Sequence, residues 1–415
     1  MSEGSDHKRD INHKRPAGSL CCHCGLCLTS YARFARETCA FVSSRIERLE
    51  RLVHGKGREI NNFDHWYFGI YEKMMAGRMA VPIEGAQWTG VISSVASEML
   101  KRDMVDGVIC VHGEGENRLK PVPCLAFTAA EVLAARGNKP MLSANLSMLD
   151  LAQKRGIRRL LFIGSGCHVQ ALRALQPRLP FDKIYVLGFP CVDNCTPESA
   201  EKFLQQVSSS PDTVVRYEFM QDYCLQFIHQ NGLRERVPFF SLQFKKLSNL
   251  IHPSCRSCFD YVNSLADLVV GYMGSPLGWQ WIIVRNQAGQ EMFEVIENQL
   301  ELQNRPIPSK GKRRWALQML LYVLDYNLWL PGRAASIAGA MARRIGPQGL
   351  EFARFSIDLH FVRNYGHVKR NYPGYVDKII PGFARRIVNQ YSLPGRGPFV
   401  QYHRAVRRIR RKWRY

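Results

Sequence analysis

The chain has 415 residues, and its 57 Lys and Arg side chains outnumber its 35 Asp and Glu side chains, so the net charge is +22. A hydrophobic fraction of 46% and an aromatic fraction of 11% are typical of folded proteins and exclude a wholly disordered chain. The length allows two or three domains. The charge favours an acidic partner, which can be a nucleic acid, an anionic lipid surface or a small acidic protein.

Two stretches bear on the cellular compartment. The first twenty residues are polar and include acidic side chains, which is typical of neither a secretory signal nor a transit peptide. The most apolar segment, 315–332, is interrupted by Asp325, Asn327 and Pro331, so it predicts a buried or surface-lying helix rather than a membrane-spanning one. We therefore expect a reducing compartment, in which the 13 cysteines are thiols or metal ligands rather than disulfides.

Changes in pattern along the chain predict five regions. We expect a flexible arm at 1–19, a cysteine-rich segment at 20–75, an α/β domain at 76–205, a mixed α+β region at 206–400 and a basic tail at 401–415. In the α/β domain, apolar runs predict strands at 105–111, 158–166 and 183–191, and helical spacing predicts helices at 90–104, 128–137 and 168–175. This alternation predicts a mostly parallel sheet flanked by helices.

Five of the cysteines lie within residues 21–39. Cys21, Cys24 and Cys27 form a C-x2-C-x2-C pattern, and Cys39 follows after a segment, 28–38, that can form a helix. Three closely stepped thiolates with a remote fourth suit a four-iron cluster, whereas zinc usually takes its cysteines in well-separated pairs. The spacing therefore favours an iron–sulfur cluster over a structural zinc ion.

A zinc knuckle is the alternative, with Cys22 or His23 as a substitute ligand. In the cluster interpretation Cys22 is out of step and has no role. Small buried hydrophobic side chains are the expectation for four further cysteines: Cys110, Cys124, Cys195 and Cys224.

Four more cysteines are placed where a second site can form. Cys167 and Cys191 each follow a predicted parallel strand, and open α/β sheets bind their ligands beyond that end of the strands. Cys255 and Cys258 make a second C-x2-C pair. Two thiols at the sheet rim and one such pair can together close a four-cysteine site.

Several motifs resemble one known family. They are CHCGLCLTSYARFARETCAF, IEGAQWTGVISSVASEML, GSGCHVQALRA, VLGFPCVDN, YEFMQD and PSCRSCFDYVNSLADLVVGYMG. Together they are similar to the flavin- and iron–sulfur-containing family of the deazaflavin-reducing hydrogenase beta subunit, in the branch from oxygenic phototrophs that reduces chlorophyll pigments. The resemblance covers roughly residues 20–400.

The resemblance implies FAD and two 4Fe-4S clusters. One cluster falls on Cys21, Cys24, Cys27 and Cys39, and the other on Cys167, Cys191, Cys255 and Cys258. The flavin-contacting loops map to GAQWTG and GNKPMLS, hence to Gly85, Thr89, Gly90, Asn138, Lys139 and Ser143. A glycine turn that opens a helix can bind a flavin phosphate through its amide groups, and a lysine can pair with the same phosphate.

For the reaction, the resemblance implies reduction of the C8 vinyl group of 3,8-divinyl chlorophyllide to ethyl, with reduced ferredoxin as electron donor. The alternative within the family is 7-hydroxymethyl chlorophyll a reductase. Plant enzymes of that second type carry an insertion after the GYMG motif, and here 271–286 runs straight through. Asp222, His360 and Tyr365 are chemically suitable proton donors, but the sequence assigns none of them.

The expected partners follow from charge and from the resemblance. Ferredoxins are acidic, so the net charge can guide their approach, and four arginines near the first cysteine group are candidates for docking: Arg33, Arg36, Arg45 and Arg48. We expect a chlorophyll-type tetrapyrrole substrate, in the cytoplasm of a cyanobacterium or the plastid stroma. Peripheral contact with thylakoid membranes and homo-oligomer formation stay open.

A more distant alternative is a zinc-stabilised nucleic-acid-binding protein. Because the basic residues are spread along the chain rather than set in a recognised nucleic-acid fold, we expect no nucleic acid as partner. Colour distinguishes the two classes, since flavin and iron–sulfur clusters absorb visible light and zinc does not.

Overall fold

The computed structural model describes residues 16–114, 117–220, 223–272, 274–276, 278–303, 311–317, 320, 330 and 332–392. Most of the predicted flexible arm, the whole basic tail and the candidate proton donor Asp222 lie outside these residues. So does much of the apolar segment 315–332.

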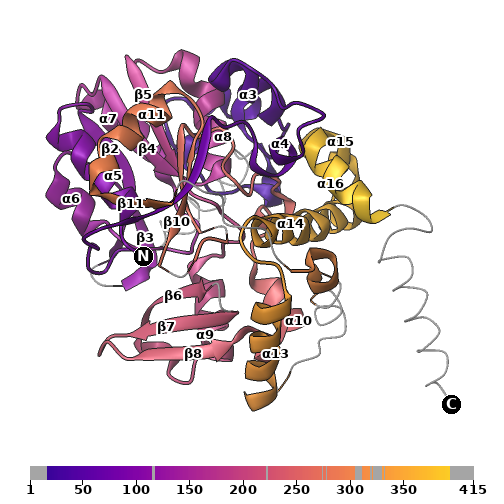
Figure 1. The fold of residues 1–415 in the computed structure, drawn as a ribbon. Helices are drawn as coiled ribbons and strands as arrows, with labels where there is room; N and C mark the ends of the chain where they lie inside the picture. The colour runs from indigo at the N-terminus through magenta and orange to yellow at the C-terminus, as the bar shows by residue number, and fades with distance from the viewer. Residues whose placement is uncertain are drawn as a thin grey trace, which may run out of the picture.

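The centre of the molecule is an eight-stranded sheet (Figure 1). Its strand order is β11 (Leu300–Gln303), β1 (Lys73–Met79), β10 (Gln280–Val284), β9 (Leu268–Gly271), β5 (Lys183–Gly188), β4 (Arg159–Gly164), β2 (Gly107–Glu114) and β3 (Asn117–Ala126). The pairs β2–β4, β4–β5 and β5–β9 are parallel. Antiparallel strands extend this parallel centre on both sides. The α/β prediction is therefore confirmed.

Two hydrophobic cores lie on the two faces of this sheet. One contains Val108, Leu161 and Val270 and is covered by α5 (Val91–Lys101), α6 (Ala129–Ala134) and α11 (Gln287–Glu294). The other contains Ile109, Phe162 and Val269 and is covered by α8 (Gly166–Leu175), the N-terminal segment and the C-terminal helices. The alternation along each strand sends successive side chains into different cores, as a sheet buried on both faces requires.

The helices of the second core come from both ends of the chain. From the N-terminal side come α2 (Ala35–Thr38), α3 (Ile46–His54) and α4 (Phe63–Phe68), and from the C-terminal side come α14 (Leu350–Asn371), α15 (Val376–Ile379) and α16 (Gly382–Ser392). Figure 1 shows the indigo N-terminal helices beside the yellow C-terminal ones. The Ser44 amide donates to the Lys378 carbonyl at 2.7 Å, and the Tyr67 hydroxyl donates to the buried Asp358 carboxylate at 2.8 Å. These contacts join the two ends of the described chain.

A smaller, three-stranded antiparallel sheet lies below the large one in Figure 1. It comprises β6 (Val214–Met220), β7 (Cys224–His229) and β8 (Arg234–Pro238), and it packs with α9 (Pro197–Val207) around a third core. Other α-helices with described bounds are α7 (Leu149–Lys154), α10 (Phe244–Leu247) and α13 (Gly332–Ile345). This arrangement agrees with the expected α+β character of the second half.

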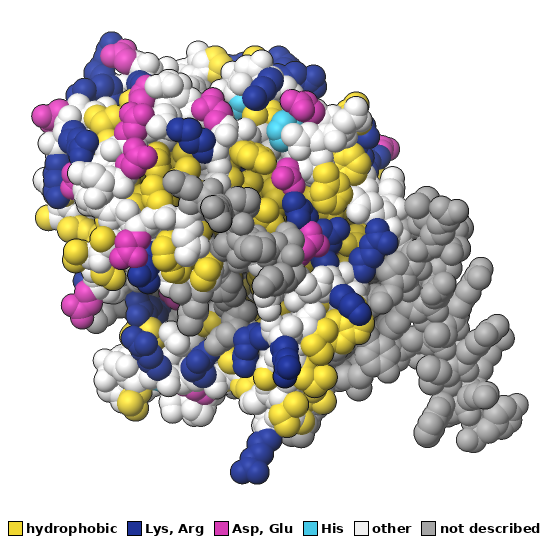
Figure 2. Space-filling model, viewed as in Figure 1, with side chains coloured by type: hydrophobic (Ala, Val, Ile, Leu, Met, Phe, Trp, Pro, Cys, Tyr) yellow, Lys and Arg dark blue, Asp and Glu magenta, His cyan; other side chains and the backbone are white. Residues whose placement is uncertain are grey.

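Helix α13 packs on one side only. Ala335, Gly339 and Ala342 are buried, whereas Ile337 and Met341 are exposed. In Figure 2, hydrophobic side chains and several Lys and Arg side chains occupy the lower part of the molecule where α13 projects. Within the described parts of the chain, none of the helices is both long enough and apolar enough to cross a bilayer.

Candidate functional site: two groups of thiols and two loops

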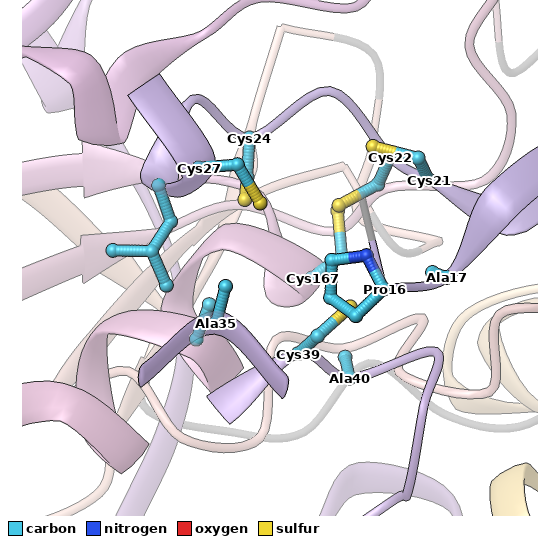
Figure 3. Close-up of a pocket in the computed structure, with 12 residues that line it drawn as sticks. Pro16, Ala17, Cys21, Cys22, Cys24, Cys27, Ala35, Cys39, Ala40 and Cys167 are labelled. Atoms are coloured by element: carbon cyan, nitrogen blue, oxygen red, sulfur yellow. The ribbon is translucent and has the colours of Figure 1, made fainter. Parts of the chain in front are cut away.

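The first group of thiols lines a single pocket (Figure 3). Cys21, Cys24, Cys27 and Cys39, the four expected ligands, all contribute to its wall. The other lining residues are two more cysteines and a set of apolar side chains: Cys22, Cys167, Pro16, Ala17, Leu26, Ala35, Ala40 and Ala171. The donors in the wall are therefore sulfur alone, in apolar surroundings.

A left-handed glycine shapes the loop that carries these thiols. Gly25 has φ = +92°, and a Cβ atom there would lie 2.5 Å from the Ala144 carbonyl oxygen. The Leu146 amide, in the 3₁₀ turn η4 (Asn145–Met148), donates to the Cys24 carbonyl at 2.8 Å. Only glycine allows this approach, because it accepts positive φ and has no side chain to clash. The loop is thus fixed against the α/β domain.

The segment between Cys27 and Cys39 differs from its prediction. Instead of one helix over 28–38, it contains the 3₁₀ turns η2 (Leu26–Leu28) and η3 (Ala32–Phe34) followed by the single turn α2. Thr29 explains the interruption, because its hydroxyl donates to the Leu26 carbonyl at 2.8 Å and accepts from the Tyr31 amide. The segment nevertheless returns Cys39 to the pocket.

Burial affects the protonation of Cys39. Burial, together with the neighbouring Cys24 and Cys21, raises the pKa of this thiol to about 12. A metal centre binds thiolates, so its insertion here must displace protons.

The second group of thiols is assembled by the large sheet. Cys167 lies in the first turn of α8, directly after β4, and Cys191 follows the end of β5. Cys255 is the first residue of the 3₁₀ turn η9 (Cys255–Ser257), and Cys258 directly follows that turn. Burial raises the pKa of the Cys191 thiol, and the neighbouring Cys255, Cys167 and Cys258 raise it further. The structure thus brings together the four cysteines that strand-end placement predicts.

Polar contacts hold the loops of this second group. The Asn364 amide on α14 donates to the Cys255 carbonyl at 2.8 Å and to the Cys258 carbonyl at 2.7 Å. The Cys191 amide donates to the Tyr261 carbonyl at 2.9 Å. The Asp260 amide donates to the Cys258 sulfur at 3.5 Å. Hydrogen bonds of this last kind tune the potential of a sulfur-ligated metal centre.

Cys22 lies between the two groups. Its thiol is hydrogen-bonded with Cys167 and Cys24, and these contacts raise its pKa. The sulfurs of Cys22 and Cys167 and a ring nitrogen of His168 lie within 4.8 Å of one another. Spacing alone assigned no role to Cys22, because a contact between residues so far apart in the sequence leaves no local signal.

The residues fit sulfur-ligated clusters at both places. In the first group, sulfur is the only donor type and the wall is apolar, which is what a buried iron–sulfur cluster requires. In the second, four buried or half-buried thiols converge from three segments of the chain. Bound clusters would be held by the two predicted sets of four cysteines.

The two predicted flavin loops lie next to each other. The Arg136 guanidinium donates to the Glu84 carbonyl at 2.7 Å, and Arg216 on β6 donates to the Gly85 carbonyl at 3.2 Å. Gly85 has φ = +72° and Gly90 has φ = +92°, which confirms the glycine turn before α5. Hydrogen bonds therefore link the segments that carry the two loops, and one of them also links the first loop to the small sheet.

Two of the predicted flavin ligands have structural partners. The Thr89 hydroxyl is buried, accepts from the Met79 amide at 3.0 Å and donates to Gln280 at 3.4 Å. The Lys139 ammonium donates to the Arg136 carbonyl at 3.1 Å and to the Gly137 carbonyl at 3.0 Å. Thr89 thus positions the loop, and Lys139 caps the end of α6. Asn138 is half-buried in the same loop.

Other side chains around these loops have polar atoms that make no hydrogen bond with the described residues. Buried nitrogen or oxygen atoms of Trp88, Ser143 and Arg216 have no hydrogen-bond partner among the described residues. The Trp88 ring stacks on Tyr272 with ring centres 5.1 Å apart. Unsatisfied buried donors beside an aromatic stack fit a polycyclic ligand such as a flavin. Trp88 and Arg216 were missed by motif matching; a tryptophan inside the glycine turn is the signal that was available.

Other predicted residues lie apart from these loops. His360 is buried on α14, and burial lowers its pKa to about 4, so it is neutral near pH 7. Tyr365, on the same helix, is half-buried. Near the first thiol group, Arg33, Arg36 and Arg48 are exposed. Arg45 is partly covered.

Comparison with known proteins gives two family models that match most of the α/β region. They describe the coenzyme F420 hydrogenase/dehydrogenase beta subunit, with its N-terminal part matching residues 74–150 and its C terminus matching residues 157–310.

Three relatives illustrate the range of similarity. An uncharacterised protein of Nostoc sp. is 52% identical over 92% of this chain and 96% of its own length. The chloroplastic 7-hydroxymethyl chlorophyll a reductase of Oryza sativa subsp. japonica is 46% identical over 92% of this chain and 84% of its own length. The coenzyme F420 hydrogenase subunit beta of Methanosarcina barkeri is 26% identical over 58% of this chain and 84% of its own length.

One solved structure has a similar fold. A chain of the F420-reducing NiFe hydrogenase complex from Methanosarcina barkeri aligns with a TM-score of 0.55 at 22% identity, over 75% of this chain and 96% of that chain. At this identity the match supports the fold alone.

Proposed function

Because the chain belongs to the coenzyme F420 hydrogenase/dehydrogenase beta-subunit family, we propose that it is an iron–sulfur flavoprotein that reduces a chlorophyll pigment. The observation that carries the proposal is the gathering of eight cysteines into two groups, and the unsatisfied buried atoms at the predicted flavin loops support it. The cofactors proposed are FAD and two 4Fe-4S clusters.

We favour the 7-hydroxymethyl group as the position reduced. The relative from rice, named for that reaction, is 46% identical over almost the whole chain, and this similarity supports the hydroxymethyl reading over the vinyl reading that the motifs first favoured. The reaction converts a hydroxymethyl group and two electrons and two protons into a methyl group and water.

Reduction of the C8 vinyl group is the second candidate. It is favoured by the uninterrupted run between β9 and β10, where plant 7-hydroxymethyl reductases are expected to carry an insertion. Both reactions consume two electrons and two protons, so the same cofactors serve either one.

The residues of the chain have separable tasks in this proposal. The two thiol groups hold the clusters, and Trp88, Ser143 and Arg216 bind and orient the flavin through the atoms that the protein leaves unsatisfied. When bound, clusters carry single electrons, and a flavin collects them in pairs. The apolar wall around the first thiol group would keep water away from a cluster bound there.

Reduced ferredoxin is the proposed electron donor. The net charge of +22 and the exposed arginines beside the first thiol group complement an acidic protein. The relatives from a cyanobacterium and from a chloroplast support a cyanobacterial cytoplasm or plastid stroma as the compartment.

The test is anaerobic purification followed by incubation with 7-hydroxymethyl chlorophyll a or with 3,8-divinyl chlorophyllide a, with reduced ferredoxin as donor. Chlorophyll a formed from the first pigment supports the favoured reading, and an ethyl product from the second replaces it with the vinyl reading. A colourless protein without iron or flavin, inert toward both pigments, rejects the proposal. Cys24→Ser and Cys255→Ser variants should each lose turnover.

A further inference from the structure

A third pair of thiols lies outside both groups described above. Cys110 on β2 and Cys124 on β3 are direct partners in the antiparallel register. Their sulfur atoms are 3.3 Å apart. These are two of the cysteines expected to be inert buried hydrophobes, and the contact between their sulfurs requires another explanation.

The backbone already has the separation that a disulfide needs. Opposite residues of antiparallel strands have Cα atoms roughly 4.5–5.5 Å apart, which lies within the range of about 4.4–6.8 Å seen across disulfides. The two sulfurs have to approach by little more than 1 Å to reach the bond length of about 2.05 Å. Side-chain rotation suffices for that change, and the strands can keep their pairing.

We propose that Cys110 and Cys124 are a redox-active dithiol, which a low-molecular-weight disulfide such as glutathione disulfide converts into a disulfide across β2 and β3. This inference goes beyond the proposed reductase function and does not depend on it.

The surroundings of the pair give its two thiols different roles. Cys110 is only 5% exposed, whereas Cys124 lies half-buried on β3, the last strand of the sheet order. A hydrogen bond with Cys110, followed by the positive surroundings of His112 and Lys139, lowers the pKa of Cys124 to about 7. A thiol whose pKa lies near the ambient pH is the most effective attacking group in disulfide exchange.

The chemistry is a two-step exchange. The Cys124 thiolate attacks one sulfur of glutathione disulfide, forms a mixed disulfide and releases one glutathione thiolate. The Cys110 sulfur then attacks the Cys124 sulfur of that mixed disulfide, and the second glutathione leaves while the Cys110 proton passes to a departing thiolate. Two cysteine thiols are oxidised, one glutathione disulfide is reduced to two glutathione molecules, and no other reactant is required.

The pair has a neighbour in the flavin loop. Lys139 lowers the pKa of Cys124 through its charge, and it caps α6 within the GNKPMLS segment. Oxidation of the dithiol removes a thiolate next to this lysine.

The experiment uses the full chain as purified anaerobically, incubated with glutathione disulfide at neutral pH, alkylated with N-ethylmaleimide and digested with trypsin. Cleavage after Arg102, Arg118 and Arg136 yields two peptides, 103–118 and 119–136, each with a single cysteine. From the treated protein we expect to recover these two peptides joined by a disulfide. From the untreated protein we expect to recover them as separate peptides, each alkylated at its cysteine. Iron content measured before and after treatment checks that the other cysteine groups are intact.

Variants separate the two steps. Cys110→Ser should leave Cys124 as a stable mixed disulfide with glutathione, because the second attacking sulfur is missing. Cys124→Ser should leave Cys110 alkylated, and Cys224→Ser, a thiol of the smaller sheet, should behave as the unmodified chain. Full alkylation of both cysteines in the treated wild-type chain, or a mixed disulfide that persists on its Cys124, overturns the proposal whether or not the variants fold.

Discussion

The two thiol groups differ in how the chain assembles them. The first is contained in residues 21–39, and a loop with one left-handed glycine brings its members to one pocket. The second spans residues 167–258 and depends on the ends of β4 and β5 and on contacts from α14. A local group is therefore visible in the spacing of a sequence, whereas a group built by tertiary structure can be predicted only through the strand ends that are expected to assemble it.

Removal of one ligand from each group tests this difference most strongly. If both groups hold clusters, Cys24→Ala and Cys255→Ala should each lose about four of about eight iron atoms. The longer span of the second group makes its cross-link more stabilising, by about 1.4 kcal/mol on a loop-closure estimate. Cys255→Ala should therefore lower the melting temperature more than Cys24→Ala does, as measured by calorimetry on anaerobic samples; equal shifts would contradict the comparison.

A matched pair of glycine substitutions separates the two groups without touching a thiol. In Gly25→Ala the new Cβ meets the Ala144 carbonyl oxygen at 2.5 Å, and in Gly166→Ala it meets the Asp260 carboxylate at 2.6 Å. Each clash should cost about 1–3 kcal/mol of stability. We expect Gly25→Ala to lose iron from the first thiol group only, and Gly166→Ala to lose iron from the second thiol group only.

Gly18→Ala is the control for backbone strain. Gly18 has φ = +52°, but a Cβ atom there meets nothing within 4 Å. This variant should retain its full iron content. If it loses as much iron as Gly25→Ala, strain rather than the clash explains the effect.

A change to acidic pH tests the contact between α3 and the segment that follows the second thiol group. His54 on α3 donates to the Ser264 carbonyl at 2.8 Å, six residues beyond Cys258. Burial, and then the charge of Arg285, lower the pKa of His54 from 6.5 to about 4. As the pH falls through that interval the unfolded chain binds a proton that the folded chain does not, so the folded state loses stability.

At pH 5 this histidine should remove about 2 kcal/mol of the stability present at pH 7. In His54→Gln that loss should disappear. The free energy of unfolding, measured with urea, should therefore differ less between pH 5 and pH 7 than it does in the unmodified chain. A difference that is unchanged in the variant would show that other groups cause the acid sensitivity.

The smallest effect is expected at the surface of the first group. Exchanging the exposed Arg33 and Arg36 for Gln should raise the KM for ferredoxin severalfold at low salt and leave turnover with a small artificial reductant unchanged. Arg234→Gln, on the exposed surface of β8, is the control and should change neither. Equal losses with both donors would exclude docking at these arginines.

Much of the fold could be predicted because its signals are local. The apolar runs at 158–166 and 183–191 became β4 and β5, and the helix predicted at 128–137 begins with a capping box formed by Thr128 and Glu131. The edge strand β11 and its neighbour β1 were missed because β11 has only four residues and the sequence of β1 does not alternate clearly. Pairing with neighbours, rather than intrinsic preference, makes them strands.

The candidate site also has parts that the sequence predicts and parts that it does not. Spacing indicated the first thiol group, and strand ends indicated the second. The contact of Cys22 with Cys167 and that of Cys110 with Cys124 depend on the packing of separate segments. For the second pair the strands give no symmetric signal either, because the register shifts between Gly113 and Glu114 and leaves Cys124 farther than Cys110 from the connection between β2 and β3.

The packing of the N-terminal segment under the C-terminal helices has a consequence for synthesis. Leu20, Cys22 and Leu26 share a core with Phe361, Phe383 and Ile387, so residues of the N-terminal segment are covered by residues that the ribosome makes much later. The nascent chain cannot complete this core until α16 has emerged. Delivery of iron and sulfur to the first thiols, if it requires a closed core, must wait until α16 has been made.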